Sequence, residues 1–376
     1  MSDTITGVEL TKRLIAFDTI NPPGNEADCF KYLASLLEPA GYELTWHDWR
    51  PNRPNLIVRL PATEPAKRAP LVYSGHVDTV PLGQAKWSVD PFAGEIKDGR
   101  LYGRGTSDMK AGVAAFVVAA LRLAKIETRH AEIQLIITSG EETGCEGALA
   151  LAESDLLSDC AALVIAEPTD NRALCGHKGA LWMNLVHEGV AAHGSMPEKG
   201  RNAIFAAVES IERLRSHDFG IKPHQVMGGP TLNVGNMQAG LNINSVPDLA
   251  RVGVDIRSVV GQTNAEIRED LQRLLGADVR LEALTDMDNV YTDFDDPWMK
   301  QVFATTEEIL GTAPEVATAT YFTDASVLKP AMGNPPTLIM GPGTMAMAHQ
   351  TDEYCEVDLL DPCIDVFARL GRDHVA

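Results

Sequence analysis

The stretch APLVYSGHVDTVP, residues 69–81, places a histidine and a carboxylate directly after a short apolar run. Residues two apart in an extended segment point to the same side, so His76 and Asp78 are expected to share one face. An imidazole binds a metal ion through one ring nitrogen, and a neighbouring carboxylate can orient the ring through the other. The spacing therefore indicates His76 as a metal ligand and Asp78 as its supporting carboxylate.

Other candidate ligands also follow apolar runs. Glu141 and Glu142 follow EIQLIIT, Glu167 follows AALVIA, and His349 comes a few residues after PTLIM. Asp108 lies just before a helical pattern in YGRGTSDMKAGVAAF. Taken alone, each has an ordinary interpretation as a helix cap, a turn residue or a solvated loop residue. Ligands of open α/β sheets bind beyond the carboxyl ends of the strands, so their joint occurrence in glycine-rich loops favours one shared site.

The chemistry of this set is that of a divalent metal centre. Two imidazoles and three carboxylates suit Zn²⁺, Co²⁺ or Mn²⁺. They are too many for a single catalytic zinc, but they fit two metals about 3.5–4 Å apart that share a carboxylate. Adjacent residues in an extended loop point in opposite directions, so one glutamate can bind metal while the other faces the attacking water. The free glutamate can then carry a proton to a leaving nitrogen.

The elements that position these residues alternate between strand and helix. Apolar runs predict strands at residues 54–60, 70–74, 132–138 and 161–166, separated by helical patterns such as residues 109–125. Such alternation is typical of an α/β domain with a largely parallel sheet. A helix at residues 296–311 and a strand at residues 336–341 return to this style near the end of the chain.

The middle of the chain follows another plan. Between residues 179 and 289 the patterns read strand, helix, strand, strand, helix, strand, and Thr263 is a candidate N-cap for the second helix. This βαββαβ order predicts a ferredoxin-like domain. We therefore expect a discontinuous α/β domain, residues 1–178 and 290–376, with a small domain, residues 179–289, inserted in it.

Composition bounds the remaining possibilities. The 376 residues are 45% hydrophobic, and the longest apolar run, residues 111–121, is far short of a membrane span of about 20 residues. The amino terminus lacks a basic region followed by an apolar core, so a cytoplasmic protein is expected. A formal charge of −20 argues against nucleic acid and anionic membranes as partners. Six cysteines without a CxxC pair are interpreted as free thiols.

Five motifs resemble those of the co-catalytic zinc aminoacylases and peptidases: SGHVDTVP, LYGRGTSDMKAG, SGEETG, AEPT and GPGTMAMAHQTDEY. This family includes acetylornithine deacetylase, succinyl-diaminopimelate desuccinylase and the glutamate carboxypeptidases. The resemblance runs from FDTINPPGNE to AHQTDEY, in the expected order, and so covers almost the whole chain. It implies a metallohydrolase domain, two divalent metal ions, an inserted lid and dimerisation domain, and a homodimer.

The resemblance assigns roles to the candidate ligands. It implies that Asp108 bridges both metals, with zinc the expected metal and cobalt or manganese the alternatives. One metal would be bound by His76 and Glu167, and the other by His349 and Glu142. Glu141 would be the general base, and Asp78 the supporting carboxylate.

Three further roles rest on the resemblance alone. His193, in GVAAHGSMPEKGRNAI, would reach the active site of a partner subunit and stabilise the tetrahedral intermediate. Asn244 and Arg257, in LNINSVPDLARVGVDIR, would hold a substrate carboxylate, which an arginine fork suits. Their alternatives are a surface histidine, a turn residue and an arginine paired with a neighbouring strand. The other histidines, among them His177 and His374, are interpreted as structural or surface residues.

These observations predict a two-metal amidohydrolase that removes an acetyl- or succinyl-type N-acyl group from an amino acid, as in amino-acid biosynthesis. Thr323-Asp324-Ala325 resembles acetylornithine deacetylases more than the GGTSDG-like segment of desuccinylases. A metallo-exopeptidase, either a carboxypeptidase or a dipeptidase acting on short peptides, is the alternative on the same scaffold. A non-catalytic metal-binding relative is the contrasting hypothesis.

Overall fold

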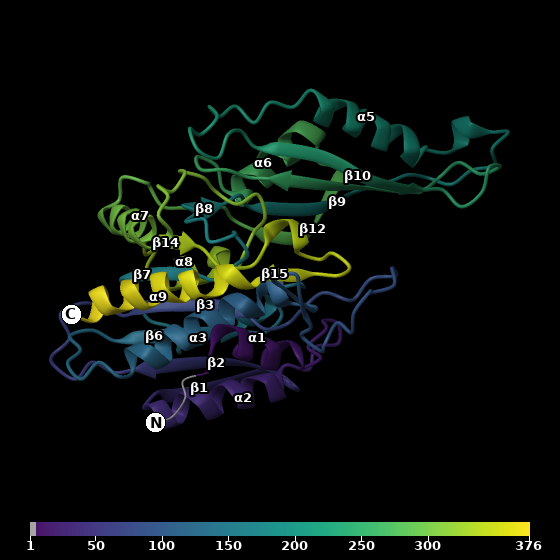
Figure 1. Cartoon of the computed structure of the whole chain (residues 1–376). Helices are drawn as coiled ribbons and strands as arrows, with labels where there is room; N and C mark the ends of the chain where they lie inside the picture. The colour runs from purple at the N-terminus through teal and green to yellow at the C-terminus, as the bar shows by residue number, and fades with distance from the viewer. Residues whose placement is uncertain (1–4) are drawn as a thin grey trace. The chain divides into compact units, whose positions relative to one another are not determined.

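The computed structural model describes residues 5–376; residues 1–4, at the start of the expected first domain, lie outside the described residues. The chain divides into two compact units, whose elements are labelled in Figure 1. The first comprises Met1–Gly176, Tyr291–Ala317 and Thr323–Ala376, and the second comprises His177–Val290 and Thr318–Phe322. The short segment Thr318–Phe322 thus belongs to the second unit, although it lies within residues 290–376.

The first unit is built on a six-stranded sheet with the order β1-β2-β6-β3-β7-β14. Its strands are β1 (Glu43–Arg50), β2 (Arg53–Leu60), β3 (Leu71–His76), β6 (Ile133–Thr138), β7 (Ala162–Ile165) and β14 (Thr337–Ile339). The strands β6, β3, β7 and β14 are mutually parallel, as the sequence predicts. The strand β2 pairs antiparallel with both β6 and β1, which makes the sheet mixed.

Burial explains the sequence pattern of the central strands. Every residue of β3, β6 and β7 is buried, which is typical of parallel strands covered on both faces. The first unit's helices are α1 (Gly7–Ile15), α2 (Ala27–Leu37), α3 (Ala111–Leu123), α4 (Glu146–Ala152), α7 (Pro297–Leu310), α8 (Ala325–Ala331) and α9 (Leu360–Val375). The central helix α3 is buried over most of its surface and packs against α1 and α9, near the strands in Figure 1.

The start of α3 is held tightly against the end of β7. A Cβ atom added to Gly112 would lie 1.9 Å from the backbone oxygen of Ala166. Only a glycine allows this approach, and it brings the loop before α3 close to Glu167, the residue that follows Ala166. A small sheet, β4 (Ile96–Lys97), β5 (Arg100–Tyr102) and β15 (Tyr354–Glu356), has the order β15-β5-β4.

The second unit has its own sheet and core. Its elements follow the order β9 (Ala180–Glu188), α5 (Ala203–Arg215), β10 (Thr231–Ala239), β11 (Leu249–Arg257), α6 (Asn264–Leu275) and β12 (Val279–Met287). The four strands are antiparallel in the order β10-β11-β9-β12, and α5 and α6 pack on the sheet (Figure 1). Thr263 caps α6 by accepting a hydrogen bond from the backbone N–H of Glu266, as predicted from the sequence.

Short elements complete the chain. The strands β8 (Gly176–His177) and β13 (Val290–Tyr291) lie where the chain passes from one unit to the other. All six cysteines are free thiols, and five of them are buried. Within residues 5–376, none of the helices combines the length and the apolar character that crossing a membrane requires.

Candidate metal centre

The first unit brings together all seven site residues that the sequence predicts within it. The strand β3 ends at His76, β6 leads into the loop of Glu141 and Glu142, and β7 is followed closely by Glu167. Asp78 lies two residues after His76, and Asp108 and His349 come from the loops before α3 and after β14. His349 has a φ of +63°, in the left-handed region that residues other than glycine seldom adopt and that is enriched at functional sites.

Asp108 lies between the two histidines. Its Oδ1 is 3.3 Å from Nε2 of His76, and its Oδ2 is 3.4 Å from Nε2 of His349. The residue does not cap α3, because the N-cap position is Lys110, two residues further along. Its backbone is not helical, with a φ of −117° and a ψ of 96°. A carboxylate that presents one oxygen to each of two imidazoles has the arrangement of a bridging ligand.

The glutamates divide between the two histidines. Oε2 of Glu142 lies 3.0 Å from Nε2 of His349. On the other side, Oε1 of Glu167 and Oε2 of Glu141 lie 3.8 and 3.9 Å from Nε2 of His76. The possible donor atoms therefore form two groups that share Asp108.

The donor atoms fit a metal ion. The Nδ1 atom of His76 lies 3.0 Å from the backbone oxygen of Asp78 and 3.5 Å from its carboxylate, so a proton on Nδ1 leaves the lone pair of Nε2 free. Within the described residues, the buried Nε2 of His76 and Oε1 of Glu142 have no partner with hydrogen-bond geometry. Leaving such atoms unsatisfied is unfavourable, and a cation would satisfy both. One ligand atom from each of His76, Asp108 and Glu142 lies within 4.8 Å of the others.

The pKa shifts of the site residues also favour a cation at this place. Burial and the neighbouring carboxylates raise the pKa of Glu141 and of Glu167 well above the ordinary value, and raise the pKa of Glu142 to about 7. Hydrogen bonds with Asp108 and Glu142 raise the pKa of His349 to about 10. Burial alone would lower the pKa of His76, but the surrounding carboxylates raise it. The crowded carboxylates thus favour positive charge at this place.

Asp78 does more than support His76. Its buried carboxylate accepts hydrogen bonds from the backbone N–H groups of Glu141 and Glu142 and from the side-chain amide of Asn21. Burial opposes ionisation, but His76 and Asn21 outweigh it and lower the pKa of Asp78. The Asp78 carboxylate therefore fixes the loop that carries two other candidate residues.

Sequence reasoning missed a buried carboxyl group beside the candidate base. Oδ2 of Asp324 accepts a hydrogen bond of 2.6 Å from Oγ1 of Thr138, while its Oδ1 has no hydrogen-bond partner in the described part of the chain. Burial raises the pKa of Asp324. The Sγ atom of Cys145 lies 3.9 Å from Oε1 of Glu141, and burial together with the charges of Asp324 and Glu141 raises the pKa of this thiol. The threonine-acidic-alanine motif, residues 323–325, is the sequence signal that marks this residue.

The second unit contains the other three predicted residues. His193 is exposed, and its Nδ1 lies 2.8 Å from Oγ of Ser195. A backbone hydrogen bond from Gly194 to the oxygen of Asn244 brings His193 and Asn244 onto neighbouring segments. Arg257 ends β11, where Asp255 binds its guanidinium at 2.9 Å and the Trp182 ring lies 5.6 Å away.

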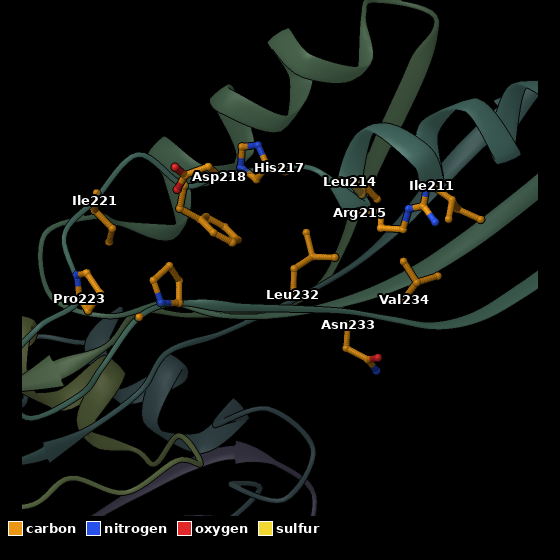
Figure 2. Close-up of a pocket in the computed structure, with 13 residues that line it drawn as sticks. Ile211, Leu214, Arg215, His217, Asp218, Ile221, Pro223, Leu232, Asn233 and Val234 are labelled. Atoms are coloured by element: carbon orange, nitrogen blue, oxygen red, sulfur yellow. The ribbon is translucent and has the colours of Figure 1, made fainter.

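A hollow of about 810 Å³ also lies within the second unit, and Figure 2 shows the side chains around it. Leu214 on α5 and Leu232 on β10 contribute to an apolar lining, and His217 and Asp218 add polar groups at one end. None of the ten predicted site residues lines this hollow. It therefore gives no support to the predicted chemistry.

Comparisons with known proteins identify relatives that span the whole chain. A probable succinyl-diaminopimelate desuccinylase from Staphylococcus epidermidis is 28% identical over 392 residues, covering 96% of this chain and 95% of the relative. An acetylornithine deacetylase from Proteus mirabilis is 30% identical over 382 residues, covering 97% of this chain and 96% of the relative.

Solved structures share the fold. The Bacillus subtilis YXEP protein, described as a dinuclear metal binding peptidase, matches with a TM-score of 0.74 at 15% identity, over 98% of this chain and 97% of that chain. The family model for peptidase family M20/M25/M40 matches residues 72–373. The chain is accordingly a hydrolase of amide bonds and belongs to peptidase family M20/M25/M40.

Proposed function

We propose that this enzyme is a two-metal amidohydrolase that removes an acetyl- or succinyl-type group from the amino group of an amino acid. The observation that carries the proposal is the position of Asp108, whose two carboxylate oxygens face His76 and His349. The two relatives of 28% and 30% identity are named as a desuccinylase and a deacetylase, which supports an N-acyl amino acid as the substrate.

The proposed ligands form two sets. His76 and Glu167 would hold one metal, His349 and Glu142 would hold the other, and Asp108 would be shared by both. Zinc is the first choice for such nitrogen and oxygen donors, with cobalt and manganese as alternatives. When bound, two such ions supply Lewis acidity, polarising the scissile carbonyl and lowering the pKa of water.

Glu141 is the proposed general base. Its carboxylate faces His76 at 3.9 Å, and the backbone N–H that it donates to Asp78 fixes its position. In the reaction it accepts a proton from the attacking water and delivers this proton to the leaving nitrogen. Burial and nearby carboxylates raise its pKa above the ordinary value of a glutamate, which makes it a stronger base for the first step. Asp78 supports both Glu141 and His76.

The second unit is the proposed lid, a ferredoxin-like domain of about residues 179–289 that also forms a homodimer. Its order of elements, βαββαβ, supports the ferredoxin-like plan. His193 acts in the active site of the partner subunit, and Asn244 and Arg257 hold the substrate carboxylate. Asp255 binds Arg257 through Nε and Nη2, which orients the guanidinium and leaves its Nη1 side for a substrate.

A metallo-exopeptidase is the second candidate, because a structure of similar fold is described as a peptidase. A substrate panel separates the two proposals. Metal-loaded enzyme is incubated with N-acetylornithine, N-succinyl-diaminopimelate, other N-acyl amino acids and dipeptides, and the freed amine is measured. Preference for one N-acyl amino acid supports the deacylase and a role in amino-acid biosynthesis. Preference for dipeptides supports the exopeptidase.

The two-metal proposal has its own test. Metal analysis of the purified protein, saturated with zinc and then dialysed, should find about two ions per chain. Metal binding without any hydrolysis in the panel would point to an amide substrate outside the panel, whereas the absence of tightly bound metal would contradict the two-metal proposal itself.

A further inference from the structure

A fully buried carboxylate, Glu353, lies beside the loop that carries Asp108 and takes no part in the proposed reaction. We propose that Glu353 is a positioning residue that holds Asp108 between the two histidines and ties the Asp108 loop to the His349 loop. This inference rests on the proposed two-metal function. It concerns how the shared carboxylate is held in place.

Glu353 receives four hydrogen bonds from one short segment. Its Oε2 accepts from Nη1 of Arg104 at 2.6 Å and from the backbone N–H of Gly105 at 2.9 Å. Its Oε1 accepts from the backbone N–H of Ser107 at 2.8 Å and of Asp108 at 3.0 Å. The last of these bonds attaches the Glu353 carboxylate directly to the backbone of the proposed bridging ligand.

The local backbone explains why this segment needs such a partner. Gly105 has a φ of +82°, and Asp108 is not helical, so the N–H groups here point away from the ladder of a regular helix. Buried backbone N–H groups require acceptors. A carboxylate placed where these N–H groups converge accepts charge-assisted hydrogen bonds, which are stronger than bonds to a neutral acceptor.

The same residue is anchored to the other metal-binding loop. Glu353 follows His349 by four positions, and its backbone oxygen accepts the N–H of Gly103 at 2.9 Å. Ser107 adds a bond from its Oγ to the backbone oxygen of Tyr354, and it accepts the backbone N–H of Thr344. The two loops are therefore cross-linked around Glu353, and movement of one changes the position of the other.

Arg104 balances the buried charge. Its side chain is 2% exposed, and Nη2 donates to the backbone oxygen of Pro81 at 3.1 Å. The guanidinium also lies 5.2 Å from the ring of Trp87. Removing one member of a buried ion pair leaves an uncompensated charge. A test must therefore separate charge balance from the positioning of Asp108.

Two substitutions make this separation. Glu353→Gln keeps the size of the side chain, but its amide NH₂ cannot accept hydrogen bonds. It would face N–H groups that donate to the carboxylate in the wild type. Glu353→Asp keeps the charge beside Arg104, but it is one methylene shorter and cannot span all four donors. Glu356→Gln is the matched control: it lies three positions further, on β15, in a partly exposed bond to Arg100 at 3.0 Å.

The experiment measures zinc and cobalt affinity by competition with a chelator, and the visible absorption spectrum of the cobalt-saturated proteins. Circular dichroism establishes that each variant is folded. Because both metals share Asp108, we expect both affinities to fall about 10–100-fold in Glu353→Gln and Glu353→Asp, as for other groups that orient ligands. The cobalt spectrum of these variants should change even at saturation, whereas Glu356→Gln should match the wild type.

Three results would overturn the inference. One is a folded Glu353→Gln protein with wild-type affinities and spectrum and only a lower melting temperature, because the residue would then be merely structural. Another is full recovery in Glu353→Asp, which would reduce its role to neutralising Arg104. A wild-type protein that binds no divalent metal would overturn both the proposed function and this inference. The wild type alone shows that failure, whereas the first two results appear only in the variants.

Discussion

One carboxylate oxygen of Asp78 accepts the backbone N–H of Glu141 at 3.2 Å, and the other accepts that of Glu142 at 3.3 Å. Asp78 also touches His76 through its backbone oxygen. A single buried residue thus fixes the positions of a candidate base and two candidate ligands, through both its side chain and its backbone oxygen. A substitution of Asp78 should therefore disturb more of the site than the loss of support for one imidazole would.

We therefore expect Asp78→Asn to lower kcat by about 10–100-fold, the range found when groups that orient metal ligands are changed. The new amide must place its NH₂ toward an N–H group of Glu141 or Glu142, so the loop shifts. Steady-state kinetics and metal analysis check this expectation. Asp48→Asn, at an exposed position on β1, is the control and should behave as the wild type.

Glu141→Gln should remove the proton carrier while leaving the proposed ligands in place. The expected fall in kcat is about 10²–10⁴-fold, the usual contribution of general acid–base catalysis. Metal content should stay at the wild-type value. The control is Glu153→Gln at the exposed end of α4. Full activity in a metal-loaded Glu141→Gln protein would rule out the assigned mechanism.

The sequence predicted the parallel strands and the candidate ligands because both depend on local patterns. Apolar runs identify buried strands, and polar residues directly after them lie at one edge of the sheet. His76 at the end of β3 and Glu167 after β7 are examples. The central helix α3 and the capping of α6 by Thr263 were likewise visible in short stretches.

The remaining features depend on contacts between distant residues, which one sequence does not display. Glu353 bonds to Arg104 across 249 positions, and Asp324 bonds to Thr138 across 186. None of the residues of β1 is fully buried, and its antiparallel pairing with β2 became visible only in the fold. These residues look like ordinary polar groups until the tertiary structure surrounds them.

Metal binding should stabilise the protein. The carboxylates gathered around Asp108 have raised pKa values or need cationic partners, and a divalent ion relieves their mutual repulsion. A ligand that binds only the native state at 100 times its Kd contributes about 2.7 kcal/mol. The melting temperature of chelator-treated protein should therefore rise when zinc or cobalt is added. Asp108→Asn should abolish most of this rise, and an equal rise in that variant would contradict the bridging role.

Gly112→Ala should disturb both stability and the site. The added methyl group would lie 1.9 Å from the backbone oxygen of Ala166, so α3 must move away from the end of β7. Overpacking of this kind destabilises a protein by about 1–3 kcal/mol. Denaturant unfolding measures the loss, and activity should fall as well because Glu167 follows Ala166. Gly229→Ala is the control, since its added methyl group meets nothing within 4 Å.

His374 makes the stability of the first unit depend on pH. Burial lowers its pKa from 6.5 to about 4, and its Nε2 lies 3.0 Å from the backbone oxygen of Ala69. The folded state thus favours the neutral imidazole, while the unfolded chain takes up a proton near the ordinary value. The stabilisation from this group is complete above pH 6.5 and is lost as the pH falls toward 4.

The stability advantage of the wild type over a His374→Gln variant should therefore be largest at neutral pH and shrink steadily in acid. Denaturant unfolding of both proteins from about pH 8 down to about pH 4 measures this difference, and the shared carboxylate contributions cancel in it. Burial also lowers the pKa of His177 to about 4, so the variant should keep part of the acid sensitivity. A difference that stayed constant between pH 6.5 and 4 would show that His374 titrates alike in the folded and unfolded states.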